Sequence, residues 1–123
     1  MEFFDLDCWK ESHVLVIKVY QIVKKFPKEE KYGLVDQLRR ASSSITANIA
    51  EGSGRYHYKD RIHFYYQSRG SLKEVQSFLI LARDLRYIEN ECFNDLWSQA
   101  KKSEMLINGL IRSSENRRIT NNV

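Results

Sequence analysis

Residues 39–55, RRASSSITANIAEGSGR, decide how this chain folds. The ten residues that follow Arg40 include no charged and no aromatic side chain, and most of them are alanine or serine. Serine runs are typical of linkers, but Ile45 and Ile49 are four residues apart, and no glycine or proline occurs before Gly52. The stretch therefore predicts a thin helix rather than a linker or a phosphate-binding loop.

This helix has more small surface than a single core needs. Its apolar seam alternates steps of four and three residues and comprises Leu34, Leu38, Ala41, Ile45, Asn48 and Gly52. The other faces carry almost no Lys or Glu over three turns, although a solvent-exposed face normally does. We therefore expect a second subunit to pack on this helix, with Arg40 and Glu51 pairing between subunits. The expected interface residues are Gln37, Arg40, Ser43, Ser44, Ala47 and Glu51.

Three further segments have amphipathic spacing, at about residues 7–25, from the stretch 55–66 to about residue 85, and at about residues 90–112. Their predicted inner stripes are Trp9, His13, Val16, Tyr20 and Val23; then Phe64, Ser68, Ser71, Val75, Phe78, Ala82 and Leu85, with Leu72 and Leu79 alongside; and Phe93, Leu96, Ala100, Ser103, Ile107 and Leu110. The sequence has one proline and five glycines, which favours long helices over many turns.

Four amphipathic segments with short connections predict an all-α fold, an up-and-down antiparallel four-helix bundle. We expect the bundle to occupy residues 1–113 and the polar residues 114–123 to fray. Gly52 and Gly54 are expected to end the second helix in a left-handed conformation. Gly70, in the middle of the third helix, is expected to allow close approach of a neighbouring backbone.

Composition excludes several classes of protein. No apolar run approaches the ~20 residues of a membrane span, and the acidic start of the chain is unlike a secretory signal. Cys8 and Cys92 are far apart and are interpreted as reduced thiols, so we expect a cytoplasmic protein without a membrane partner. The net charge of +4 is compatible with a polyanionic partner.

No motif in the sequence predicts catalysis. His57, Asp60 and His63 are three residues apart, but no cysteine or second carboxylate completes a metal site. The inner stripes contain no carboxylate of the kind that di-iron bundles require. We therefore predict a protein that is not an enzyme and that holds no metal or cofactor.

The basic residues between positions 36 and 74 are more informative, because tyrosines interleave with them. Arginines contact phosphates, and aromatic rings stack on unpaired bases. The predicted phosphate contacts are Arg39, Arg40, Arg55, Lys59, Arg61, Arg69 and Lys73, and the predicted stacking groups are Tyr56 and Tyr58. The alternative is an ordinary solvated surface, in which Asp36 and Arg40 form an ion pair within one helix.

Residues 26–55, FPKEEKYGLVDQLRRASSSITANIAEGSGR, closely resemble the signature of the four-helix-bundle family of 23S rRNA intervening-sequence proteins. RGSLKE at 69–74 is similar to a second piece of the family pattern, and Leu6 and Trp9 are similar to its opening. The resemblance implies a homopentameric ring. Related proteins are accessory factors of diversity-generating retroelements, and this relationship implies that a basic pentamer binds nucleic acid and a reverse transcriptase.

Together, the residues and the resemblance predict a non-enzymatic, oligomeric four-helix bundle that binds RNA or DNA without sequence specificity. A ring would repeat a modest basic patch around its circumference, and binding to a polyanion grows with the number of phosphate contacts. The alternative prediction is a scaffold for protein–protein interaction that binds no nucleic acid.

Overall fold

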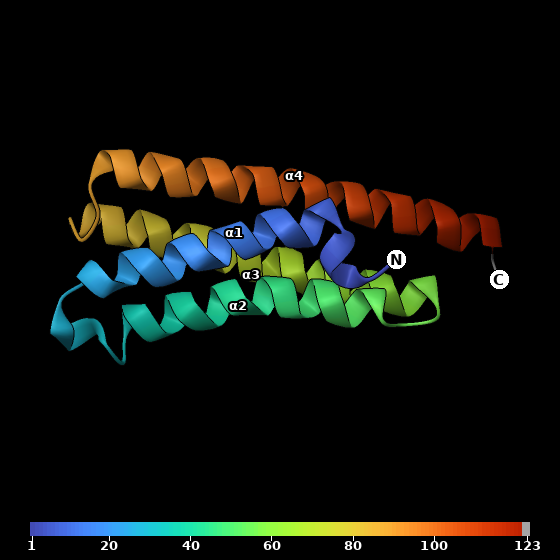
Figure 1. Ribbon diagram of the computed structural model, residues 1–123, viewed down its shortest axis with the longest axis horizontal. Coiled ribbons are helices and arrows are strands. Elements are labelled where there is room, and N and C mark those ends of the chain that lie inside the picture. Colours follow the sequence, from blue (N-terminus) through green and yellow to red (C-terminus); the bar gives the residue numbers. More distant parts are fainter. Residues whose placement is uncertain (122–123) are drawn as a thin grey trace.

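The computed structural model describes residues 1–121, which form four α-helices and no β-strand. The helices run side by side in alternating directions, as the prediction of an up-and-down antiparallel bundle requires (Figure 1). Short 3-10 helices, η1, η2 and η3, span Phe3–Asp5, Val23–Lys25 and Lys28–Glu30. The α-helices are α1 at Asp7–Ile22, α2 at Leu34–Ser53, α3 at Tyr58–Asp84 and α4 at Asn90–Asn121.

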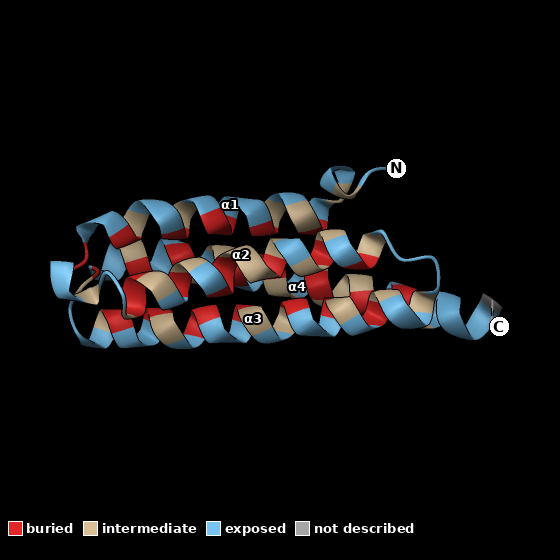
Figure 2. Ribbon diagram, turned by 90° about the horizontal axis from the view of Figure 1, so that it is seen from below, coloured by how far each residue is buried: buried red, intermediate tan, exposed pale blue. Residues whose placement is uncertain are grey.

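The hydrophobic core lies inside the bundle, where each helix packs against two neighbouring helices. Helix α1 packs against α2 and α4, and α3 packs against the same two helices. Buried residues face the inside of the bundle and exposed residues face outward (Figure 2). Burying one large aliphatic side chain contributes about 1.5–3 kcal/mol to stability. The side chains Leu15, Leu38, Ile45, Ile49, Leu72, Leu79 and Ile107 are all completely buried.

The predicted inner stripe of α1 is confirmed at Val16 and Val23 and wrong at His13 and Tyr20, which are exposed. The buried side chains are Cys8, Ser12, Leu15, Val16, Val19 and Val23, whereas His13 is exposed and stacks on the half-buried Trp9. The sequence prediction favoured large aromatic side chains for the inside. The α1–α4 contact instead takes small ones, because the Ser12 hydroxyl hydrogen-bonds the Ser103 hydroxyl across it.

The predicted stripe of α3 is rotated in a similar way. Leu72 and Leu79 form its centre and are completely buried, whereas Phe64 and Phe78 are only half-buried and Leu85 is 46% exposed. Tyr65, which the prediction omitted, is 2% exposed. The positions predicted correctly as buried are Ser68, Val75 and Ala82, together with the flanking Leu72 and Leu79, whereas Ser71 is half-buried.

The apolar seam of α2 is confirmed except at Asn48, which is half-buried beside the completely buried Ile49. The Asn48 amide donates to the Ser44 carbonyl oxygen at 2.9 Å and to the Ser44 hydroxyl at 3.0 Å. Ser71 of α3 donates to the same Ser44 hydroxyl at 2.9 Å. Asn48 therefore supports a polar contact between α2 and α3 instead of a core position.

Helix α4 is longer than the sequence predicts. Its seam is confirmed at Phe93, Leu96, Ala100, Ser103 and Ile107, and it continues through the buried Ile111 and Ser114. The expected end near Arg112 is wrong, because the helix runs to Asn121 and projects beyond the other helices (Figure 1). The predicted boundary at residue 113 therefore falls inside α4. The last two residues of the predicted frayed tail, 122–123, lie outside the described part of the chain.

Gly52 permits a close approach between α2 and α3. A β-carbon built at Gly52 would lie 2.6 Å from Cε1 of Tyr65, so the Tyr65 ring occupies the space that a side chain would need. The left-handed stop predicted at Gly52 and Gly54 is wrong, because no glycine among residues 1–121 has a positive φ. The close approach predicted at Gly70 is also wrong, because nothing lies within 4 Å of a β-carbon there.

The two connections at one end of the bundle are tied together by Glu30. Its Oε1 accepts a hydrogen bond from the Leu34 amide at 3.1 Å, which satisfies a free N–H in the first turn of α2. Its Oε2 accepts a hydrogen bond from the Tyr87 hydroxyl at 2.8 Å, in the α3–α4 turn. The Leu34 amide and then the Tyr87 hydroxyl lower the pKa of the Glu30 carboxyl.

The α3–α4 turn places a non-glycine residue in a left-handed conformation. Arg86 has φ 64°, and the Tyr87 amide donates to the Ala82 carbonyl while the Arg86 amide donates to the Arg83 carbonyl. This pair of bonds is the Schellman arrangement that ends many helices.

Over residues 1–121, none of the helices has the length and apolar character needed to cross a bilayer.

Gly52 and Gly70 provide a matched test of the packing. We expect Gly52→Ala to lower the free energy of unfolding by about 1–3 kcal/mol, because the added methyl group would overlap the Tyr65 ring. Gly70→Ala should raise it by about 0.5–1 kcal/mol, because alanine favours the helix and meets no neighbour. Urea unfolding followed by circular dichroism measures both changes. Equal shifts in the same direction would contradict the packing.

Candidate nucleic-acid interface

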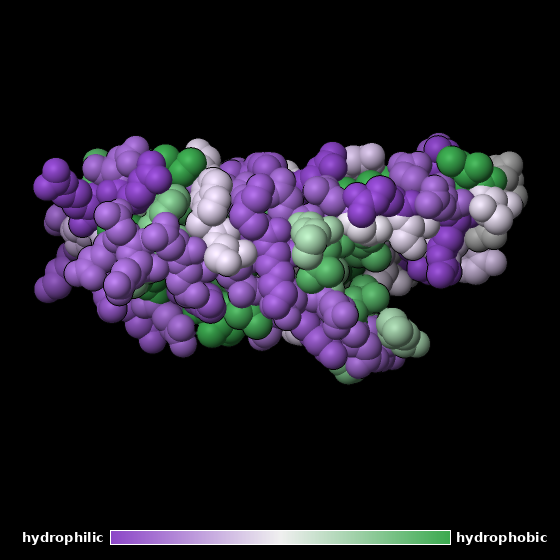
Figure 3. Space-filling model, turned by 90° about the horizontal axis from the view of Figure 1, so that it is seen from above, coloured by the Kyte–Doolittle hydropathy of each residue, from purple (hydrophilic) through white to green (hydrophobic). Residues whose placement is uncertain are grey.

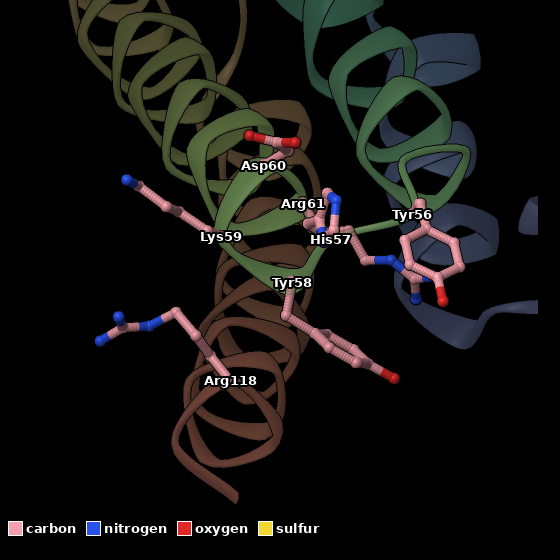
Figure 4. Close-up of a pocket in the computed structure, with 7 residues that line it drawn as sticks. All are labelled: Tyr56, His57, Tyr58, Lys59, Asp60, Arg61 and Arg118. Carbon is pink, nitrogen blue, oxygen red and sulfur yellow. The ribbon is translucent and has the colours of Figure 1, made fainter. Parts of the chain in front are cut away.

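Five cations gather where α2 ends, α3 begins and α4 ends. We call this set, Arg55, Lys59, Arg61, Arg117 and Arg118, the basic end. Three of its members, Lys59, Arg61 and Arg118, line an open hollow of about 720 Å³ beside the projecting part of α4 (Figure 4). Lys59 and Arg118 extend toward one side of this view, and Tyr56 lies on the other. The hollow is lined by Tyr56, His57, Tyr58, Lys59, Asp60, Arg61 and Arg118.

The loop between α2 and α3 is held by its own arginines. The Arg61 guanidinium donates through Nε to the Arg55 carbonyl oxygen at 2.6 Å. The Arg55 guanidinium pairs with Glu51 one turn earlier at 3.2 Å and lies over the Phe64 ring, 4.8 Å from its centroid. The Arg61 side chain is thus held by a backbone carbonyl and the Arg55 side chain by an aromatic ring. This support lowers the conformational entropy that the two side chains would lose when a ligand binds.

Helix α4 supplies the two arginines of the basic end that the sequence prediction missed. Arg117 donates to the Tyr58 hydroxyl at 3.3 Å, and this bond, with the nearby Arg61 charge, lowers the pKa of Tyr58. Arg118 pairs with Glu115 at 3.3 Å and remains 48% exposed. The sequence prediction placed both arginines in a frayed C-terminal tail. The continuing seam from Ile107 through residues 111 and 114 is the signal that would have extended the helix.

The two predicted stacking residues differ in accessibility. Tyr56 is 86% exposed, and its ring meets His57 edge-on at 5.0 Å. Tyr58 is half-buried, with the Arg61 guanidinium 4.7 Å above its ring, so one of its faces is already covered. Tyr56 is therefore the ring of this end that a base can reach most freely.

The structure does not bring all the predicted phosphate contacts together. Arg39 and Arg40 lie toward the other end of α2, where Arg40 pairs with Asp36 at 3.0 Å. Arg69, in the middle of α3, donates to the Asn108 side chain at 3.1 Å and, like Arg112, lines a separate hollow. The remaining predicted contact, Lys73, is held in an ion pair.

Lys73 belongs to a cluster around Glu104 that joins α3 to α4. The Glu104 carboxylate accepts hydrogen bonds from Lys73 at 2.6 Å, Lys101 at 3.0 Å and Gln76 at 3.4 Å. Its side chain is only 15% exposed. The Lys73 ammonium is the largest influence and, with Lys101 and Gln76, lowers the pKa of Glu104 to about 2. Lys73 therefore has a structural partner and is less available to phosphate than Lys59.

The predicted interface residues lie along the outside of α2, with one exception. Gln37, Arg40, Ala47 and Glu51 are exposed, and Ser43 is half-buried. The Ser43 hydroxyl donates to the Arg39 carbonyl oxygen at 2.9 Å, so it is satisfied within its own helix. Ser44, in contrast, turns toward Ser71 of α3. We call the exposed set Gln37, Arg40, Ala47 and Glu51 the outer face of α2.

The histidines do not form a metal site within the described residues. No three His, Cys, Asp or Glu side chains of residues 1–121 lie close enough together to hold an ion. His63 Nε2 instead lies 3.1 Å from the Gln67 amide nitrogen, one turn along α3.

Polar side chains cover most of the surface that faces the viewer in Figure 3, and the apolar side chains there form small separate groups. Fold and site together define a four-helix-bundle protein with a cationic end. The chain belongs to the 23S rRNA-intervening sequence protein family, whose pattern matches residues 4–109. This finding confirms the resemblance seen in the sequence. No curated protein is similar enough to the chain to count as a match.

A crystal structure from Bacteroides thetaiotaomicron is similar to this fold. It is described as a protein with unknown function from the S23 ribosomal protein family. The two structures have a TM-score of 0.76 and 19% sequence identity, and the similarity covers 85% of this chain and 97% of the other. At that identity the similarity establishes the fold alone.

The Glu104 cluster predicts a pH dependence of stability. Because the folded pKa of about 2 lies below the ordinary value of 4.5, the stabilisation is complete above pH 4.5. It is lost as the pH falls from about 4.5 to about 2. At pH 7, Glu104→Gln should lower the free energy of unfolding by about 1–2 kcal/mol.

Urea midpoints measured from pH 2 to pH 7 test this expectation. The gap between the original protein and Glu104→Gln should close across the acidic window. Glu74→Gln is the matched control, because Glu74 is exposed on α3. The urea midpoint of this variant should follow that of the original protein at every pH. A gap of constant size from pH 7 to pH 2 would show that the charge of Glu104 does not stabilise the fold.

Proposed function

We propose that this protein binds the sugar–phosphate backbone of RNA or DNA through the basic end, without sequence specificity and as a homo-oligomer. The supporting observation is the convergence of the α2–α3 loop, the first turns of α3 and the last turns of α4 at one place. Residues 51–61 and 115–118 contain five Lys and Arg against three Asp and Glu. The proposed role is cytoplasmic and involves no catalysis.

Different residues of the basic end have different roles in this proposal. Lys59 and Arg118 extend into the solvent and provide direct phosphate contacts. Arg55 and Arg61 shape the loop and add charge at fixed positions. Tyr56 offers a ring on which an unpaired base can stack, because it is exposed and next to these cations.

Oligomerisation is part of the proposal, because one basic end contributes only a few phosphate contacts. The outer face of α2 supports a subunit contact, because Ala47 is exposed there. At neighbouring half-buried positions of α2, the hydroxyls of Ser43 and Thr46 donate to carbonyl oxygens of their own helix. A partner helix could therefore approach closely without leaving those hydroxyls unsatisfied. The homopentameric ring implied by the family resemblance would repeat the basic end five times.

The same face favours a second candidate function. A different protein, such as the reverse transcriptase implied by the resemblance, could dock on the outer face of α2 and use the bundle as a scaffold. In that case the basic end would be a solvated surface. The two candidates differ in how binding to nucleic acid responds to salt.

Affinity for structured RNA or duplex DNA should fall steeply between about 50 and 200 mM salt, because phosphate contacts release counterions. Lys59→Gln and Arg118→Gln each remove one cation that faces the phosphates. Each variant should therefore reduce the slope of log affinity against log salt by about one for every subunit that contacts the nucleic acid. Fluorescence anisotropy with labelled oligonucleotides measures this slope.

Arg40→Gln and Lys73→Gln are the controls, because Arg40 near the start of α2 and Lys73 in the middle of α3 lie away from the basic end and should leave the slope nearly unchanged. Affinity that does not depend on salt would overturn the electrostatic proposal and favour the scaffold. A slope that falls equally in all four variants would place binding elsewhere than the basic end.

Light scattering after size exclusion should give a mass near five times 14.6 kDa. Ala47→Glu should shift this mass toward the monomer, because it places an unpaired charge on the outer face of α2. Ser98→Glu adds the same charge to an exposed position of α4, which does not neighbour α2, and should leave the mass unchanged. A stable monomer of the unmodified protein would exclude the oligomer.

A further inference from the structure

A second hollow, of about 410 Å³, lies between α3 and α4, and the proposed function does not use it. Of its lining side chains only Ile111 is buried, and the others are exposed or half-buried. A ligand in solution therefore has access to them. Five of these lining residues can bind a ligand or carry charge, namely Tyr66, Arg69, Asn108, Arg112 and Glu115.

Arg69 is held in this hollow with most of its hydrogen-bonding capacity unused. Its Nη1 donates to the Asn108 Oδ1 at 3.1 Å, and its guanidinium carbon lies 4.8 Å from the Tyr66 ring centroid. A guanidinium has five N–H donors, and within residues 1–121 Asn108 is its one hydrogen-bond partner. Arg69 is half-buried, so it is open to solvent. A phosphate would therefore accept from Arg69 without displacing a protein contact.

The two arginines of the hollow are not neutralised by an acidic partner. Neither Arg69 nor Arg112 forms an ion pair within the described part of the chain. Glu115 is the carboxylate that lines the hollow, and it is paired with Arg118 at 3.3 Å. The hollow therefore carries a net positive charge that attracts phosphate.

The hollow adjoins the basic end. The Glu115–Arg118 ion pair joins the two, because Glu115 lines this hollow and Arg118 lines the hollow of the basic end. On α3, Lys59 and Tyr66 are seven residues apart, which is close to two turns, so they lie on the same side of the helix. Lys59 and Arg118 also extend toward the same side in Figure 4. A strand bound at the basic end would therefore continue along α3 into the second hollow.

We propose that one single-stranded segment of RNA or DNA binds lengthwise across both hollows, so that unpaired nucleic acid is the preferred ligand. This inference rests on the proposed function, because it extends the contact made by the basic end. Arg69 and Arg112 would bind phosphates. An unpaired base would stack on Tyr66, which is 44% exposed, or on the guanidinium plane of Arg69. The bases of a duplex are stacked on one another, so a duplex would contact the basic end alone.

The distance along α3 sets the length of the bound segment. Lys59 and Arg69 are ten residues apart, which is about 15 Å at about 1.5 Å per residue. A stacked strand advances about 3.4 Å per nucleotide, so about five nucleotides reach both hollows. No residue of α2 lines the second hollow, and the subunit contact proposed on the outer face of α2 leaves it open.

Fluorescence anisotropy with two labelled probes tests the proposal. One probe is an oligothymidylate of about eight nucleotides, which stays single-stranded, and the other is a blunt DNA duplex. Tyr66→Ala and Arg112→Gln should each weaken binding of the oligothymidylate by at least about fivefold and should change duplex binding by less than about twofold. Tyr66→Phe keeps the ring and should bind both probes like the unmodified protein.

Variants of the basic end separate this inference from the proposed function. Lys59→Gln and Arg118→Gln should weaken both probes, whereas Arg40→Gln, which lies away from both hollows, should weaken neither. Loss of binding in the basic-end variants, with no loss of oligothymidylate binding in Tyr66→Ala and Arg112→Gln, would overturn this inference and leave the proposed function intact. Binding that none of these variants weakens would overturn both.

The unmodified protein gives a further test that needs no variant. An oligothymidylate of about three nucleotides is too short to reach both hollows, so its affinity should be at least about tenfold lower than that of the longer probe. Equal affinity for the two lengths would overturn lengthwise binding. Equal losses on the single strand and the duplex in Tyr66→Ala and Arg112→Gln would show that the second hollow does not select unpaired bases.

Discussion

The contact between Gly52 and the Tyr65 ring sets the geometry on which the rest of the molecule depends. A β-carbon at Gly52 would lie 2.6 Å from that ring, so only glycine allows α2 and α3 to meet this closely. The contact lies in the last turn of α2, just before the α2–α3 loop, which the Arg61–Arg55 bond then closes. The position of the basic end thus follows from the close packing of α2 against α3, which fixes the loop between these two helices.

Polar contacts between helices specify how the bundle is packed, because aliphatic residues alone would allow several rotations of each helix. The Ser68 hydroxyl donates to the Ile45 carbonyl oxygen at 2.8 Å, and Ser12 meets Ser103 across α1 and α4. Each of these serines is completely buried, so breaking its bond would leave a buried hydroxyl unsatisfied. Small polar residues therefore act as alignment points between apolar layers.

Much of the fold could be predicted from helical periodicity, and much of the site could not. The four helices and the seams of α2 and α4 follow from spacing, because leucines and isoleucines repeat there without ambiguity. In α1 the choice of the Trp9 and His13 stripe over Cys8 and Ser12 failed, since hydrophobicity does not reveal which side pairs with a serine. Arg117 and Arg118 were missed as part of α4 because most residues after Ile111 are polar. The buried positions Ile111 and Ser114, which continue the apolar seam, were therefore overlooked. Which cations are already paired, as Lys73 is with Glu104, depends on neighbours far apart in the sequence.

The length of α4 has a consequence for how a complex would form. At about 1.5 Å per residue, its 32 residues give a rod much longer than the 20 of α2, so its tip stands clear of the bundle. Charges at such a tip act at long range, and they accelerate the first encounter with a polyanion more than they prolong residence. In the proposed complex, the projecting end of α4 would contact a nucleic-acid strand first, and the α2–α3 loop would bind it afterwards.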